Sequence, residues 1–240
     1  MTNATEHVLI FGGTSGIGLA AARRLASEGL KVTIAGRDKD RLAAAADALA
    51  GKVNARPLDA ANPAQVREFF EVFGAFDHLV LALGSGRGFG PFATLDLGEV
   101  RRGFEEKVWP HLSCAQAALP TIRKHGSITF ISAVSAQMAA PGIAGLAAAN
   151  GVLTTVTPIL ATELRPLRVN AVTPGVIDTP WWDFLPAEQR RAAFAEYGGK
   201  SPVGRIGAPD DVAKAISFLI ADSFVTGHVL TCDGGLRLAA

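Results

Sequence analysis

The stretch "FGGTSGIG" occupies residues 11–18, directly after the apolar run "HVLIF" (7–11). Its glycines permit a tight turn and let backbone N–H groups approach a ligand closely. Ile17, Ala21 and Leu25 then share one face by i, i+4 spacing, which predicts an amphipathic helix. The N-terminus of a helix favours an anion. The stretch therefore predicts a strand, a phosphate-binding loop and a helix, the first unit of an α/β fold.

Further apolar runs of strand length follow along the chain. They are "KVTIA" (31–35), "VNARPL" (53–58), "HLVLAL" (78–83), "SITFIS" (127–132), "RVNAVT" (168–173) and "HVLTC" (228–232). Because helix-length segments separate them, the pattern favours a parallel sheet covered by helices on both faces. We expect one domain, 1–240, with a doubly wound sheet (a Rossmann fold) of about seven strands. Irregular structure is expected at 84–92 and 180–208.

Composition limits the classes of function. The 240 residues are 49% hydrophobic and carry a net charge of +1, with Lys and Arg scattered along the chain. We expect a small-molecule ligand, with no nucleic-acid or membrane partner. Cys114 and Cys232 have neither disulfide nor metal-ligand spacing, so no metal site is expected. The chain shows no leader pattern and no apolar run of about 18 residues, so a cytoplasmic location is expected.

Four other segments extend the glycine-rich motif to nearly the whole chain. They are "LDA" (58–60), "LALG" (81–84), "RVNAVTPGVIDTP" (168–180) and "TGHVLTCDGG" (226–235). With these segments the chain resembles the classical short-chain dehydrogenase/reductase family. The resemblance implies hydride transfer between NAD or NADP and an alcohol or carbonyl. It also implies a homodimer or homotetramer in which the final strand is buried against a neighbouring subunit.

The resemblance assigns the cofactor contacts residue by residue. They are Gly12, Thr14, Ser15, Gly16, Ile17, Gly18, Arg37, Asp59, Ala60, Gly84, Pro174, Gly175, Val176 and Thr179. Members that prefer NAD carry an acidic residue at the end of the second strand, where this chain has Gly36 and then Arg37. A guanidinium suits a 2′-phosphate, so NADP is expected to be preferred over NAD. Alternatively, Arg37 is a solvated residue that pairs with Asp38 or Asp40.

The family's catalytic side chains are replaced in this chain. The positions of its serine, tyrosine and lysine fall at Ala133, Leu146 and Asn150, and the position of its asparagine falls at Lys107. Carbonyl reduction needs a proton donor beside the oxygen, and leucine cannot ionise. The resemblance therefore implies the geometry of the site without its usual acid.

Other residues are candidates for the missing chemistry. Ser135 shares the face of Ala133 if the backbone there is extended, whereas Ser132 then points the opposite way. Lys107 brings an amine toward the site, or alternatively reaches solvent beside two glutamates. His111 is expected to be a packed histidine, and Tyr197, the single tyrosine, is expected to be a packing aromatic.

The segment "PWWDFLPAEQRRAAFAEYGG" (180–199) is rich in aromatic residues. In the resembled family this region, here 180–208, covers the substrate, so an aromatic-walled pocket is one interpretation. An oligomer contact or simple core packing is the other interpretation.

Two functions remain open from the sequence. The first is an NADP(H)-dependent oxidoreductase with an atypical active site and a small apolar substrate. The second is a nucleotide-binding pseudoenzyme that acts as a sensor or an oligomer partner.

Overall fold

A seven-stranded parallel sheet forms the centre of the protein, in the order β3-β2-β1-β4-β5-β6-β7. The computed structural model describes residues 5–239. The strands are β1 (His7–Phe11), β2 (Lys31–Gly36), β3 (Val53–Pro57), β4 (Phe76–Leu81), β5 (Ile122–Ile131), β6 (Arg168–Pro174) and β7 (Val229–Cys232). All neighbouring strands pair in parallel. The predicted doubly wound fold and its seven strands are confirmed.

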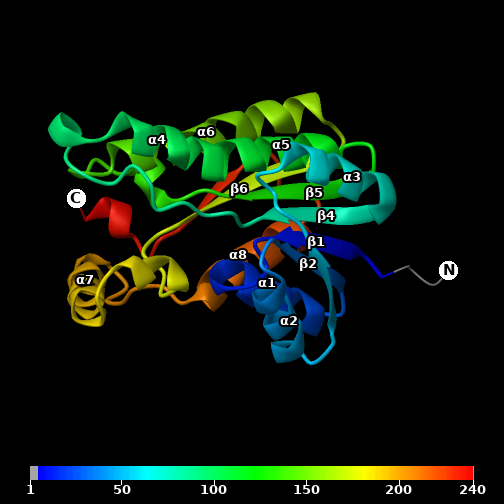
Figure 1. Ribbon diagram of the computed structural model, residues 1–240, viewed down its shortest axis with the longest axis horizontal. Helices are drawn as coiled ribbons and strands as arrows, with labels where there is room; N and C mark the ends of the chain where they lie inside the picture. Colours follow the sequence, from blue (N-terminus) through cyan, green and yellow to red (C-terminus); the bar gives the residue numbers. More distant parts are fainter. Residues whose placement is uncertain (1–4, 240) are drawn as a thin grey trace.

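Helices cover both faces of the sheet (Figure 1). They are α1 (Gly16–Ser27), α2 (Lys39–Ala48), α3 (Pro63–Phe73), α4 (Leu97–Gly103), α5 (Trp109–Ala118), α6 (Ala144–Glu163), α7 (Ala187–Lys200) and α8 (Pro209–Ala221). One face carries α1, α2 and α8, and the other carries α3, α5 and α6. A π-helical turn, η2 (Phe104–Val108), joins α4 to α5.

Each face of the sheet has its own apolar core. Along β1, Val8 and Ile10 belong to the core under α1 and α8, whereas Leu9 and Phe11 belong to the core under α3 and α5. Successive side chains of a strand point to opposite faces, so a strand buried on both sides must be apolar throughout. The unbroken run "HVLIF" meets that requirement.

The strand order reverses beside β1, and this reversal positions the site. The chain proceeds from β1 to β2 and β3 on one side, and then crosses to β4 on the other. Such a reversal opens a crevice at the carboxyl ends of the two central strands. The glycine loop lies there. A Cβ added to Gly12 would lie 2.5 Å from the Ala82 carbonyl oxygen, and one added to Gly18 would lie 2.2 Å from the Gly12 oxygen. Only glycine fits at either position.

The segment 180–208 is more regular than the sequence suggested. It contains a 3-10 turn, η4 (Pro180–Phe184), and the 14-residue helix α7. The expectation of irregular structure was wrong here because "AEQRRAAFAEY" consists largely of strong helix formers. By contrast, 82–91 contains neither strand nor helix, as expected for most of 84–92.

Helix α6 has 20 residues and is apolar enough, by length and composition alone, to cross a membrane. A helix that covers the sheet of an α/β fold can be equally long and equally apolar. Here α6 packs against β6 and the neighbouring 3-10 turn η3 (Val134–Gln137). One helix of this kind is weak evidence for a membrane span.

Candidate active site

The N-terminus of α1 has the properties of an anion site. Ser15 precedes the helix with an extended backbone, but its side chain makes no capping hydrogen bond, and the first turn contains no acidic residue. The first N–H groups of a helix have no partner within the helix. They are therefore left to a ligand, and together with the helix dipole they favour a diphosphate. Thr14, Ile17 and the glycines form the rest of this loop.

The end of β2 lies beside the same loop. A Cβ added to Gly36 would lie 2.8 Å from the methyl carbon of Thr14, so the position has no room for an acidic side chain. Arg37 is exposed. Asp38 caps α2 by accepting hydrogen bonds from the backbone N–H groups of Asp40 and Arg41, both at 3.0 Å. Among residues 5–239 no ion pair involves Arg37, so the alternative pairing with Asp38 or Asp40 is not found.

A turn after β3 presents the next predicted contacts. The Asp59 carboxylate accepts a hydrogen bond from the backbone N–H of Ala61 at 3.0 Å, and the Asp59 N–H donates to the Gln65 side chain at 3.3 Å. Asp59 and Ala60 are half-buried. These bonds hold the turn beside the carboxyl ends of β2 and β3.

The nicotinamide end of the predicted site is built from the segment after β6. The Gly175 N–H donates to the Cys232 carbonyl at 3.0 Å, and a Cβ on Gly175 would lie 2.8 Å from the Cα of Asp233. Pro174 ends β6 and Val176 follows the turn. The Thr179 side chain lies 3.2 Å from the position of a Cβ on Gly16. The fold thus brings the segment after β6 against the glycine loop.

Trp181 lies against the loop after β4. Its indole N–H donates to the Ser85 carbonyl at 3.2 Å, and its ring lies 3.7 Å from the positions of Cβ atoms on Gly84 and Gly86. The predicted cofactor contacts from the loops after β1, β2, β3, β4 and β6 therefore meet at one edge of the sheet.

Asn150 is the centre of a small polar network at the predicted catalytic positions. Its amide nitrogen donates to the Ser135 hydroxyl at 3.1 Å and to the Leu146 carbonyl at 2.9 Å. Its side-chain oxygen is buried without a hydrogen-bond partner among the described residues. The Ser132 hydroxyl donates to the Asn150 carbonyl at 2.9 Å. Ala133, between these groups, adds no polar atom.

The chain leaves the extended conformation directly after Ala133. Residues Val134–Gln137 form the 3-10 turn η3, so the alternation of faces assumed for Ser132 and Ser135 ends there. Both serine hydroxyls consequently contact Asn150. The Ser135 hydroxyl accepts the amide N–H, which leaves its own O–H free to donate elsewhere.

Lys107 is buried, with 7% of its surface exposed. Its ammonium donates to the Ser132 carbonyl at 3.3 Å, and burial lowers the pKa of Lys107 from 10.5 to about 8. The neighbouring Glu105 and Glu106 are exposed. The alternative in which Lys107 reaches solvent is therefore wrong. The π-helical turn adds a residue to the helix repeat and shifts which side chains face the sheet.

His111 is a fully buried, packed histidine, as predicted. One ring nitrogen lies 2.7 Å from the Lys107 carbonyl and the other lies 2.9 Å from the Leu81 carbonyl. Burial and the nearby Lys107 charge lower the pKa of His111 to about 3, so the ring is neutral. His111 links the π-helical turn to the end of β4, which positions Lys107 beside the sheet.

Tyr197 lies on α7, with its ring centroid 6.2 Å from that of Trp182. Trp182 also contacts Phe194 and Trp181, and its indole N–H donates to the Ile177 carbonyl at 3.1 Å. Tyr197 is therefore a packing aromatic, as expected, within a half-buried aromatic cluster of the segment 180–200.

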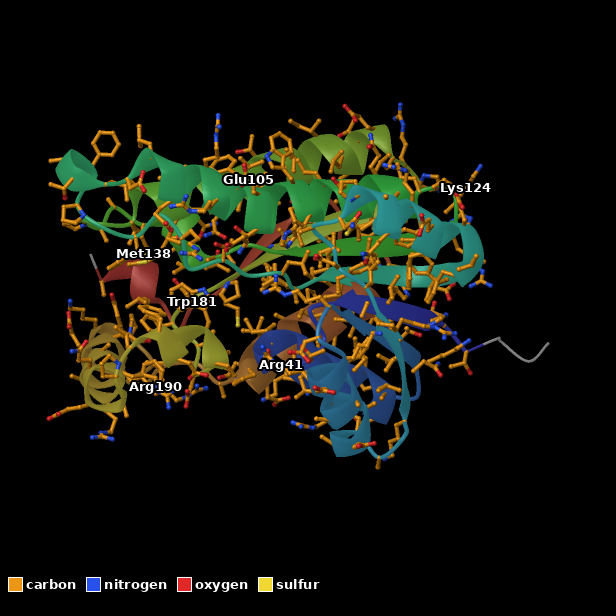
Figure 2. The ribbon with its side chains drawn as sticks, in the orientation of Figure 1. Arg41, Glu105, Lys124, Met138, Trp181 and Arg190 are labelled. Atoms are coloured by element: carbon orange, nitrogen blue, oxygen red, sulfur yellow. The ribbon has the colours of Figure 1, made fainter. Side chains whose placement is uncertain are left out.

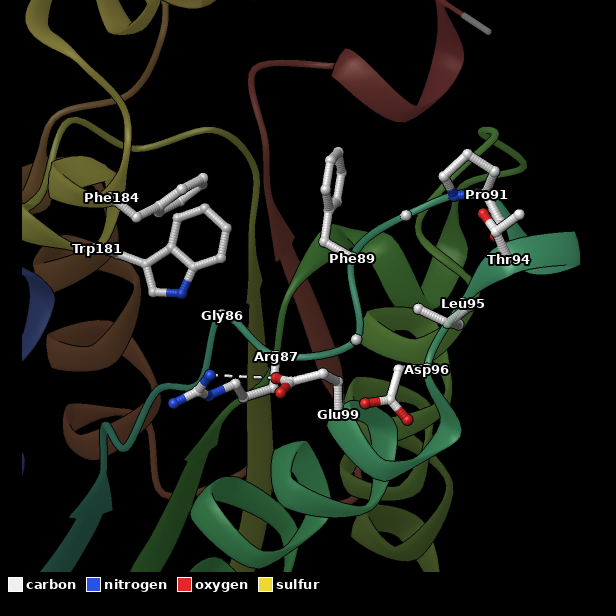
Figure 3. A pocket seen from close by; sticks show the side chains of 12 residues that line it. Gly86, Arg87, Phe89, Pro91, Thr94, Leu95, Asp96, Glu99, Trp181 and Phe184 are labelled. Carbon is white, nitrogen blue, oxygen red and sulfur yellow. Dashed lines mark hydrogen bonds and ion pairs between the residues drawn. The ribbon is translucent and has the colours of Figure 1, made fainter.

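A cavity of about 740 Å³ opens between this segment and the loop after β4 (Figure 3). Trp181 and Phe184 line one side, Phe89 lies across from them, and Arg87 and Glu99 form the floor. Sequence reasoning missed the contribution of the loop. In "GSGRGFGPF" (84–92), an arginine and an aromatic residue alternate with glycines, and this pattern could have indicated a ligand-binding loop.

Comparisons with known proteins agree with the fold. A family model described as enoyl-(acyl carrier protein) reductase matches residues 12–237. The chain is 33% identical to the short-chain dehydrogenase/reductase ATR9 of Stachybotrys chlorohalonatus, covering 97% of each chain. It is 34% identical to the 3-oxoacyl-[acyl-carrier-protein] reductase FabG of Thermotoga maritima, over 95% of this chain and 96% of that protein. Among solved structures, a small-chain dehydrogenase in complex with NADPH matches with a TM-score of 0.86 and 31% identity, covering 98% and 100% of the two chains.

Proposed function

Because the chain belongs to the classical short-chain dehydrogenase/reductase family, we propose that it is an NADP(H)-dependent oxidoreductase with an atypical proton donor. The substrate is a small apolar molecule that gains or loses hydride. The uncapped N-terminus of α1 and the glycines that admit no side chain fit a dinucleotide diphosphate. NADP(H), when bound, supplies or accepts the hydride.

The preference for NADP(H) over NAD(H) rests on the end of β2. Gly36 has no room for the acidic side chain that would accept hydrogen bonds from a ribose hydroxyl and repel a phosphate. Arg37 next to it is exposed and pairs with neither neighbouring aspartate. A free guanidinium at this edge supports recognition of the 2′-phosphate.

The buried amine of Lys107 is the observation that carries the proposed activity. An amine with a pKa of about 8 exchanges protons near neutral pH, unlike an ordinary lysine. Its only hydrogen bond among the described residues is the 3.3 Å contact with the Ser132 carbonyl. An ammonium has three N–H donors, so two of them have no hydrogen-bond partner among the described residues.

In the proposed reduction, the substrate oxygen lies against the Ser135 hydroxyl, which Asn150 orients. As hydride reaches the carbon, the Lys107 ammonium gives a proton to the oxygen, directly or through one water, and becomes a neutral amine. Solvent restores that proton. Leu146 forms an apolar wall beside these groups, which favours substrates without charge at the reacting end. Oxidation is the reverse.

The test is consumption of NADPH and NADH by the wild-type protein with a panel of ketones, imines and activated alkenes. Turnover with NADPH that Lys107→Met reduces by about 100-fold or more would support the proposal. Unchanged turnover in Lys107→Met would contradict the proposed donor. Tight NADPH binding with no turnover on the whole panel would instead support the pseudoenzyme.

A further inference from the structure

Three aromatic side chains face the cavity that lies between the loop after β4 and the segment 180–184. Phe89 and Phe184 are 62% and 59% exposed. Exposed aromatic rings that share one cavity are an unfavourable surface for water and a favourable one for a flat apolar ligand. Figure 3 shows Trp181 and Phe184 on one side of the cavity and Phe89 on the other, with open space between them.

The rings of Trp181 and Phe184, which form one wall of the cavity, contact each other before any ligand binds. The Trp181 indole is fixed by its hydrogen bond to the Ser85 carbonyl at 3.2 Å. Phe184 meets the Trp181 ring edge to face, with ring centroids 5.3 Å apart and an interplanar angle of 88°. A ligand that stacks in this cavity does not have to order the wall, which lowers the entropic cost of binding.

The charged groups of the cavity are already paired with one another. Arg87 donates to Glu99 at 3.1 Å and to Glu106 at 3.3 Å. Asp96 accepts from the Gly98 N–H at 2.7 Å and lies 3.5 Å from Arg102. Among the residues that line the cavity, the carboxylates of Asp96 and Glu99 outnumber the single guanidinium of Arg87. An anionic ligand therefore meets a net negative charge and a cation that is already paired with two carboxylates.

The two neutral side-chain donors that line the cavity are already engaged. The Thr94 hydroxyl donates to the Pro91 carbonyl at 3.4 Å, and the Trp181 N–H donates to the Ser85 carbonyl at 3.2 Å. The aromatic rings are therefore the main neutral surface that a ligand can contact here.

We propose, on the basis of the function proposed above, that this cavity selects an uncharged planar aromatic carbonyl compound with two or three fused rings. Its volume of about 740 Å³ lies within the usual range of small-molecule pockets and leaves ample room for such a ligand. One lining residue, Gly88, lies close to α6: a Cβ added to Gly145, which immediately precedes Leu146, would lie 2.5 Å from the Gly88 carbonyl oxygen.

The test compares 2-acetylnaphthalene with its saturated counterpart 2-acetyldecalin, which has the same skeleton without the flat rings. Calorimetry with NADP⁺ present measures binding alone, because the oxidised cofactor cannot reduce either ketone. We expect the aromatic ketone to bind about two- to tenfold more tightly. A naphthalene that carries both the acetyl group and a carboxylate should bind at least about tenfold more weakly than 2-acetylnaphthalene.

Two substitutions in the cavity wall test whether the cavity causes the preference for the aromatic ketone. Phe89→Leu and Phe184→Leu should each weaken binding of the aromatic ketone about two- to tenfold and leave the saturated one within about twofold. Phe224→Leu is the matched control, because Phe224 is 98% exposed and does not line the cavity. Equal or tighter binding of the saturated ketone, or indifference to both variants, would overturn the proposal. Selective binding of the aromatic ketone with no oxidation of NADPH would support the proposed ligand class of the cavity and contradict the proposed function.

Discussion

Replacing Lys107 with methionine is expected to stabilise the protein and remove most of its activity. Methionine has a similar volume and no charge, so it fills the buried space without the cost of desolvating an ammonium. The pKa of Lys107 is about 8 instead of 10.5. Each unit of that difference corresponds to about 1.4 kcal/mol, so at neutral pH the buried ammonium costs the folded state about 3 kcal/mol.

Part of this gain is offset, because the Ser132 carbonyl loses the donor that lies at 3.3 Å. A lost donor costs about 1–2 kcal/mol, which leaves a net gain of about 1–2 kcal/mol and a rise of about 2–8 °C in melting temperature. The cost of the ammonium is complete below the folded pKa of about 8 and disappears as pH rises toward the ordinary 10.5. The advantage of the variant should therefore shrink across that interval.

Thermal unfolding at a series of pH values measures the stability of the variant, and NADPH-driven ketone reduction measures its activity. Wild-type reduction should slow above about pH 8 as the ammonium loses its proton, and Lys107→Met should lower kcat by about 100-fold or more. Lys124→Met is the control. Lys124 is exposed and lies in β5 at the right-hand end of the molecule in Figure 2, away from Trp181. A variant that melts at a lower temperature, or gains the same stability at every pH, would refute the reasoning.

Four further predictions follow from the same structure. Arg37→Ala should weaken NADPH binding about ten- to a hundredfold and leave NADH binding nearly unchanged, as measured by calorimetry. Replacing Ala133, Leu146, Asn150 and Lys107 together by the family's serine, tyrosine, lysine and asparagine should raise turnover of simple ketones, whereas Ala133→Ser, Leu146→Tyr or Asn150→Lys alone should raise it little, because such residues act as a unit. The pKa values of His111 and His7 are lowered to about 3 and about 4. Stability should fall as pH drops from about 6.5 toward 4, by about 2 kcal/mol for His111 at pH 5, and thermal unfolding tests this. Light scattering should find a dimer or tetramer, since β7 is an edge strand, and a stable monomer at micromolar concentration would contradict this.

The regular part of the fold was predictable from local pattern. Strand β1 and helix α1 follow from apolar periodicity and from glycines at the turn, and all of these signals lie within twenty-five residues of sequence. The same holds for β2, β4 and β6, whose apolar runs are bounded by polar segments, whereas β5 begins five residues before its predicted run and includes the exposed Arg123–His125. A local sequence pattern predicts a helix or strand correctly where burial in the folded protein and local backbone geometry favour the same residue types.

The candidate site was less predictable, because its geometry depends on departures from regular structure. A π-helical turn directs Lys107 inward, and a 3-10 turn brings Ser135 to Asn150. Neither turn has a pattern that apolar spacing would reveal. The cavity wall was missed for a related reason, since Phe89 and Trp181 come from segments about ninety residues apart that meet only in the folded chain.

The most direct test of the central claim uses NADPH that carries deuterium at the transferring position of C4. The protein and this cofactor are mixed with 2-acetylnaphthalene under single-turnover conditions, and mass spectrometry locates the deuterium. Hydride transfer at this site predicts one deuterium on the carbinol carbon of the product for each NADP⁺ formed, at a rate that Lys107→Met lowers by about 100-fold or more. NADPH that stays bound and reduced, with no labelled product from this or any other carbonyl compound, would contradict the account.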